Sequence, residues 1–112
     1  MNEIEPLDFF VRESIAVLEP AEWHAIDQQM ATTRHQLREM GVSLDDPKEL
    51  QAVVATTRAI ARHVVNHLYL TCEGAPMMHT LEHIGGALAI FGVVLREACK
   101  TQGVEFYAEV EA

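Results

Sequence analysis

The feature that most constrains this chain is an unbroken apolar run, Ile84–Leu95, in its second half. A helix needs about 20 apolar residues to cross a bilayer, so this shorter run is typical of a buried helix segment. Because the run is apolar all round, a helix formed by it has no side that favours water. A chain of 112 residues can hardly enclose one helix completely. We therefore expect a second copy to cover part of the run, in a homodimer.

Proline and glycine positions divide the chain into four expected helices, at about 6–18, 21–40, 47–71 and 76–101, with a tail at 103–112. The third has the clearest start. Asp46 is an N-cap acid, Pro47 suits the first turn, and Glu49 can reach back to the cap. Gly41 is well placed to end the second helix in a left-handed cap, and Gly103 to stop the fourth.

The core must be mainly aliphatic, since hydrophobic residues make up 49% of the chain and aromatic residues only 6%. This composition favours helix packing over a β-sandwich. No repeat and no long linker is present, so we expect one domain over 1–112. The predicted fold is all-α, a four-helix bundle dominated by a long antiparallel hairpin of the third and fourth helices.

The net charge of −9 and the scattered basic residues argue against direct nucleic-acid binding. The first five residues are acidic where a signal peptide would be basic, which predicts a cytoplasmic protein without membrane contact. Cys72 and Cys99 would stand roughly 35 Å apart along a straight helix, too far for a disulfide. Reduced thiols fit the same compartment.

Four of the six histidines form two pairs with a spacing of four residues. His63 and His67 lie on the third expected helix, and His79 and His83 on the fourth. Residues four apart share a helix face, and an antiparallel turn would set the two pairs level. Imidazole is a good ligand for zinc, copper, nickel or iron. An alternative interpretation is therefore a metal-binding helical bundle that uses this four-histidine cluster.

No combination of residues predicts catalysis, so we expect neither an enzyme nor a cofactor. Cys72 lies near His79 in the sequence, but the neighbouring Glu73 disfavours a reactive thiolate. Gly85 and Gly86 fall inside an expected helix rather than after a strand, which excludes a phosphate-binding loop.

Two groups of residues are candidates for contact with other proteins. A strip of small side chains in the fourth helix either lets a second copy approach or packs within the chain. The predicted self-interface comprises Gly85, Ala89, Ile90, Gly92, Val93 and Val94. Aromatic residues often anchor protein interfaces. The predicted partner-binding residues are Phe9, Phe10, Val11, Phe106 and Tyr107, for each of which core packing is the alternative.

Two local strings resemble the small helical quorum-sensing antiactivators of the TraM and QslA type. One is Pro20-Ala21-Glu22-Trp23 leading into Thr33-Arg34-His35-Gln36-Leu37. The other is Met78-His79 followed by Ala87-Leu88-Ala89-Ile90-Phe91-Gly92. Together with length and helix order, the likeness covers about two thirds of the chain. It implies a homodimer that binds a LuxR-type transcription factor and blocks its dimerisation or its DNA binding. The four-histidine cluster departs from the family pattern.

Overall fold

A computed structural model describes residues 5–71 and 74–107, with the side chains at 69–82 and 84 left out. Four helices form this described part: α1 (Pro6–Ile15), α2 (Pro20–Glu39), α3 (Pro47–Thr71) and α4 (Gly74–Gln102). The all-α prediction is confirmed, since no strand occurs in the described ranges. The expected range 47–71 coincides with α3. In contrast, α1 ends before residue 18 because the amides of Val17 and Leu18 bond three residues back, to Ser14 and Ile15.

Capping residues explain where α2 begins and ends. At its start, Glu19 and Glu22 form a capping box, and the Glu19 amide donates to the Glu22 carboxylate over 3.1 Å. At its end, Gly41 adopts a φ of +85°, which an L side chain rarely tolerates. The Val42 amide then donates to the Leu37 carbonyl over 2.8 Å, closing the helix as the sequence predicts.

The start of α3 follows the predicted motif with one difference. Asp46 caps the helix by accepting a 2.9 Å hydrogen bond from the Lys48 amide. Glu49 does not turn back to the cap, however, and its carboxylate accepts from the Ser43 amide. This contact ties the loop before α3 to the first turn of the helix.

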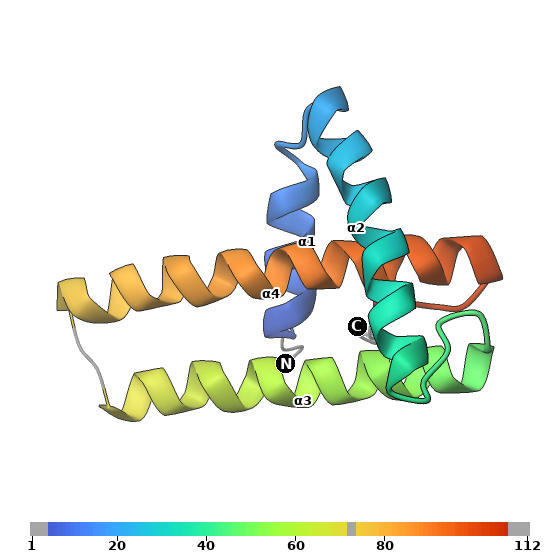
Figure 1. The fold of residues 1–112 in the computed structure, drawn as a ribbon. Helices are drawn as coiled ribbons and strands as arrows, with labels where there is room; N and C mark the ends of the chain where they lie inside the picture. Colours follow the sequence, from blue (N-terminus) through green and yellow to red (C-terminus); the bar gives the residue numbers. More distant parts are fainter. Residues whose placement is uncertain (1–4, 72–73, 108–112) are drawn as a thin grey trace.

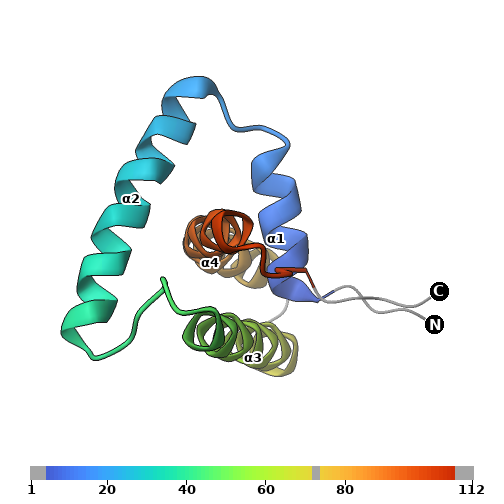
Figure 2. The same ribbon diagram turned by 90° about the vertical axis from the view of Figure 1, so that its right-hand side faces the viewer.

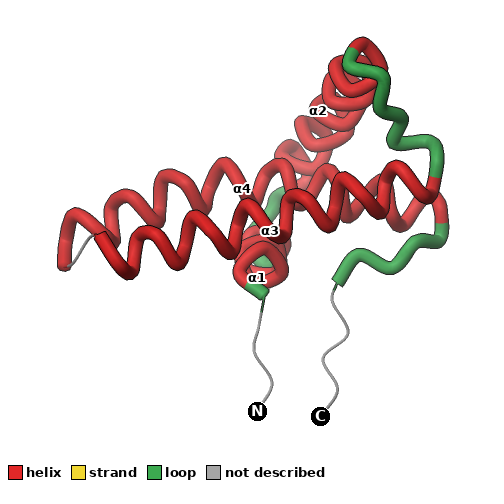
Figure 3. Tube along the Cα trace, turned by 90° about the horizontal axis from the view of Figure 1, so that it is seen from below, coloured by secondary structure: helices red, strands yellow, loops and turns green. Residues whose placement is uncertain are grey.

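The helix α4 is the centre of the arrangement, because it contacts α1, α2 and α3. Figure 1 shows α3 and α4 side by side and running in opposite directions, with α1 and α2 crossing them. Figure 2 looks along this pair and shows α4 held between α1 and α2. Figure 3 shows α1 and α2 on opposite sides of the pair. The crossing helices thus cover the middle and the C-terminal part of α4, whereas its first turns lie beside α3 alone.

The core forms where these helices meet. Leu7 and Val11 of α1 are fully buried, and so are Val94 and Leu95 of α4. Leu50 of α3 is buried with them in the same cluster. Within the described residues, the end of the apolar run in α4 is therefore covered by the chain's own helices, which removes part of the reason for expecting a second copy around it.

Candidate functional site

The predicted partner-binding residues divide into buried and accessible ones. Val11 is fully buried and Phe106 nearly so, and both belong to the core, so neither is accessible to a partner on the surface of the single chain. Phe9 is 47% exposed, and Phe10 and Tyr107 are half-buried. The burial of Val11 follows from its place on the side of α1 that packs on α4.

The accessible members come from both ends of the sequence, and an arginine of α1 contacts the one from the C-terminal end. The ring of Phe9 meets that of Phe10 edge to face, at a centroid distance of 6.0 Å. Arg12 is three residues after Phe9 and so lies on the same side of α1. Its guanidinium carbon is 3.9 Å from the centre of the Tyr107 ring. We call Phe9, Phe10, Arg12 and Tyr107 the aromatic patch.

Tyr107 is held in place by its neighbours. Its ring contacts that of Phe106 edge to face at 5.1 Å, and the guanidinium of Arg96 approaches from α4 at 5.9 Å. Cations favour the faces of aromatic rings. The patch thus presents a phenol ring whose orientation is restricted by both Arg12 and Arg96.

A buried arginine holds the segment after α4 in place. Arg58 of α3 donates to the carboxylate of Asp8 in α1 and to the carbonyl oxygen of Phe106. The side chains of Arg58 and Asp8 are only 11% and 6% exposed. Gly103 adopts a φ of +68° at the end of α4 and lets the chain turn toward this anchor. Arg58 thus joins α3 to α1 and to the segment after α4, which are distant from it in the sequence.

Two shallow pockets of about 200 and 220 Å³ flank the segment from Glu105 to Tyr107. Four of the eight basic side chains, Arg12, Arg58, Arg96 and Lys100, line these pockets or contact the aromatic rings. These cations are accompanied by carboxylates, since Arg58 pairs with Asp8, Arg96 and Lys100 lie near Glu97, and Glu105 lines both pockets. The basic group of the patch itself is Arg12 over the Tyr107 ring, which suits a partner that offers apolar and acidic groups.

The chemistry of these pockets gives no indication of catalysis. The thiol beside the first pocket belongs to Cys99, which is fully buried. Burial raises the pKa of the Cys99 thiol, and the nearby charge of Arg58 opposes this only in part. Since the thiolate is the reactive form, Cys99 is an inert thiol in the folded chain.

The predicted self-interface is largely occupied by α1. A Cβ atom at Gly85 would lie 3.2 Å from the Phe10 ring, and one at Gly92 would overlap Val11. The strip of small residues in α4 thus lets α1 of the same chain approach closely. Five of the six predicted members are buried: Gly85, Ala89, Gly92, Val93 and Val94. Ile90 alone stays accessible, at 54% exposure.

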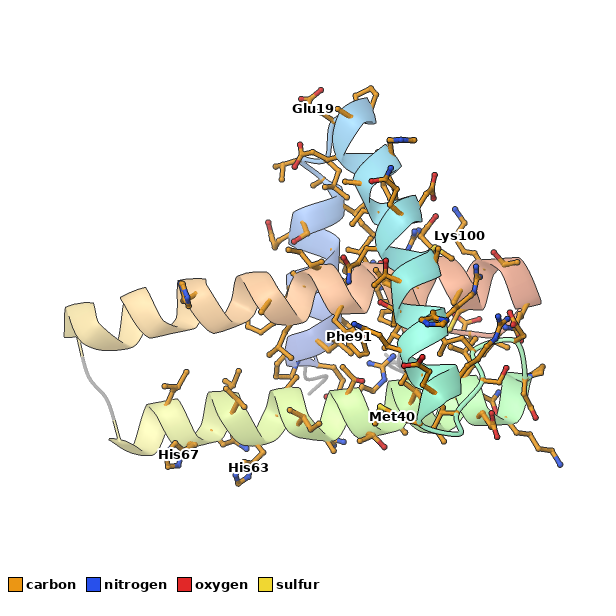
Figure 4. The ribbon with its side chains drawn as sticks, in the orientation of Figure 1. Glu19, Met40, His63, His67, Phe91 and Lys100 are labelled. Carbon is orange, nitrogen blue, oxygen red and sulfur yellow. The ribbon has the colours of Figure 1, made fainter. Side chains whose placement is uncertain are left out.

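The orientation of the histidines does not support a four-imidazole cluster within one chain. Figure 4 shows that His63 and His67 project from the side of α3 that faces away from α4. His83 is exposed on α4, and the side chain of His79 lies outside the described residues. Among the described residues, no group of three or more His, Cys, Asp or Glu side chains could hold a metal ion.

Sequence reasoning missed Asp8, Arg12 and Arg58 as organisers of the site. Arg12 and Arg58 were expected among the scattered basic residues. Asp8 and Arg58 are separated by 50 positions, and no local pattern relates them. Only the crossing of α1 over α3 brings them together.

Comparisons of the chain with protein-family models, with curated proteins and with solved structures gave no match. No helix of the described part is long and apolar enough to cross a membrane.

Proposed function

We propose that the chain is a protein-binding negative regulator that sequesters a LuxR-type transcription factor in the cytoplasm, with the aromatic patch as its contact surface. The observation that carries this proposal is the contact of Arg12 with the Tyr107 ring, about one helical turn from the exposed Phe9. Tyrosine and arginine are enriched among the few residues that dominate binding energy at interfaces. The resemblance to the antiactivators supplies the class of partner.

The patch is suited to binding because its Tyr107 ring is already restrained. Tyr107 is restrained by two arginines, and Phe106 below it is buried and bonded through its carbonyl to Arg58. A side chain that is ordered before binding loses less entropy on association. The fold therefore already restricts the Tyr107 ring, and less conformational entropy is lost when a partner binds it.

The composition of the patch indicates what it contacts on the regulator. An apolar helix surface edged by Asp or Glu would cover Phe9 and Tyr107 and pair with Arg12. Masking such a surface would prevent the regulator from forming its own dimer or from binding DNA. The expected homodimer remains part of the proposal, and Ile90 is the accessible residue of its predicted interface.

The test measures DNA binding by a purified LuxR-type regulator from the same organism, using fluorescence anisotropy of its promoter DNA. Addition of the chain should weaken the apparent affinity for DNA. The variants Phe9→Glu and Tyr107→Ala should each need about 30-fold more protein for the same effect, the size expected for an interface anchor.

A matched control is Met40→Glu, because Met40 is 75% exposed at the end of α2 and outside the patch. This variant should inhibit as well as the unmodified chain. Circular dichroism must show that all variants are folded. The proposal fails if the unmodified chain leaves DNA binding unchanged at large excess, or if both patch variants inhibit normally.

A further inference from the structure

The solvent side of α3 is unusual because it carries no charge over most of its length. Between Leu50 and Thr71 the only charged residues are Arg58 and Arg62. Both point toward α1, where Arg58 pairs with Asp8 and Arg62 lies 3.4 Å from the Glu5 carboxylate. A surface helix normally places charged and polar side chains on its solvent side. In a chain with a net charge of −9, this uncharged surface needs an explanation.

The uncharged side has a regular composition. Steps of three and four residues place its exposed members on one face of the helix. We call this set the outer face of α3: Ala52, Thr56, Ala59, Ile60, His63 and His67. Its side chains are small except for Ile60, which is 51% exposed, and the two histidines. The outer face therefore offers a smooth surface with two metal ligands at one end.

The two imidazoles are already arranged as neighbours. Their ring centres are 6.4 Å apart, and the ring planes differ by only 17°. Both rings project into solvent from the side of α3 that faces away from α4 (Figure 4). Helices that bind zinc through His residues use the same four-residue spacing. With zinc–nitrogen bonds of about 2.1 Å, two rings on one ion have centres about 5 Å apart. Because the rings are stacked, both side chains must also turn about their χ angles before their nitrogens face one ion, and their exposure leaves room for this.

We propose that His63 and His67 bind a divalent transition metal such as Zn²⁺, and that the same pair from a second copy completes the coordination. Imidazole suits zinc, copper and nickel. Two ligands make only half of a tetrahedral set, so the site is incomplete in one chain. A two-fold axis through the ion would place four imidazoles around it and would pair one α3 with another.

The rest of the outer face allows this approach. Helices pack at interaxial distances of about 8–10 Å when the side chains between them are small, as at Ala52, Thr56 and Ala59. Ile60 would be covered by the second helix. Two chains of charge −9 repel each other, and a bound cation at their junction offsets part of that repulsion. The metal thus supplies both ligation and charge compensation to the homodimer.

This inference deepens the homodimer part of the proposed function but does not involve the aromatic patch. The test is sedimentation equilibrium of metal-free protein during titration with Zn²⁺. The mass should double at one ion per two chains and return to its starting value when a chelator is added. With Co²⁺ as the probe, the visible absorption should be that of a four-coordinate ion.

The variants His63→Gln and His67→Gln should abolish the change in mass. His24→Gln is the matched control, because His24 is an exposed histidine of α2, and it should behave like the unmodified chain. All three substitutions are at exposed positions, so the metal-free melting temperatures should agree. Binding of one ion per chain without a change in mass would overturn the proposal. So would no binding, or metal-driven doubling in His63→Gln. Inhibition of the regulator is assayed without metal, so the two proposals fail separately.

Discussion

Substitution of two glycines in α4 by alanine should change stability in opposite directions. In an exposed helix interior, Gly→Ala normally stabilises by about 1 kcal/mol because alanine loses less backbone entropy on folding. Gly86 is exposed, and a Cβ atom there would meet nothing within 4 Å. We therefore expect Gly86→Ala to raise the free energy of unfolding by about 1 kcal/mol.

At Gly92 the same change meets the core. The new Cβ would overlap the Val11 side chain and lie 3.0 Å from Cδ1 of Leu7, and both side chains are fully buried. Valine is stiff about χ1, so it cannot move aside without shifting α1. Overpacking of this kind costs about 3 kcal/mol at the upper end of its range. Since alanine gains about 1 kcal/mol in helix propensity, Gly92→Ala should lower the free energy of unfolding by about 2 kcal/mol.

The two variants should thus differ by about 3 kcal/mol, or roughly 13 °C in melting temperature for a chain of this size. Urea unfolding followed by circular dichroism measures the difference. In a double-mutant cycle, Val11→Ala should cost less in the Gly92→Ala background than in the unmodified chain, because it removes the clash. Equal stability of Gly92→Ala and Gly86→Ala would refute the close packing of α1 on α4.

Two further predictions concern the anchor and the buried thiol. Arg58→Met should destabilise the fold by about 3–5 kcal/mol in urea unfolding, because it leaves Asp8 buried without its counter-charge and releases the Phe106 carbonyl; a loss below 1 kcal/mol would contradict the anchor. In a Cys72→Ser background, Cys99 should react with a thiol reagent only as fast as the chain opens, since burial raises the pKa of the Cys99 thiol. Fast labelling of the native chain would contradict the burial of this thiol. Because the thiol ionises at lower pH in the unfolded chain than in the folded one, Cys99 should also lower the free energy of unfolding as the pH rises above the ordinary thiol pKa.

Helix positions were predictable because their causes are local. Pro47 and Asp46 start α3 through a missing amide and a side-chain cap, and Gly41 ends α2 through a positive φ. The shortening of α1 was not predictable to the residue. Proline at position 20 restricts the preceding residue but does not fix where the turn begins.

The candidate site was predictable in part. Of the residues predicted to bind a partner, Phe9 is exposed and Tyr107 half-buried, whereas their neighbours Val11 and Phe106 are in the core. Sequence composition alone cannot distinguish these outcomes, since an apolar side chain serves a core or an interface equally well. The side of α1 that faces α4 is set by the close packing of Val11 and Leu7 on Gly92.

The sequence by itself determined the all-α class, the limits of α3 and the lack of charge on most of that helix, because each depends on residues close together along the chain. The tertiary structure decided which apolar surface stays accessible. It did so through contacts such as that of Arg58 with Phe106, which are 48 positions apart. Pairings at such separation arise from the crossing of whole helices, and no periodicity within a single helix encodes them.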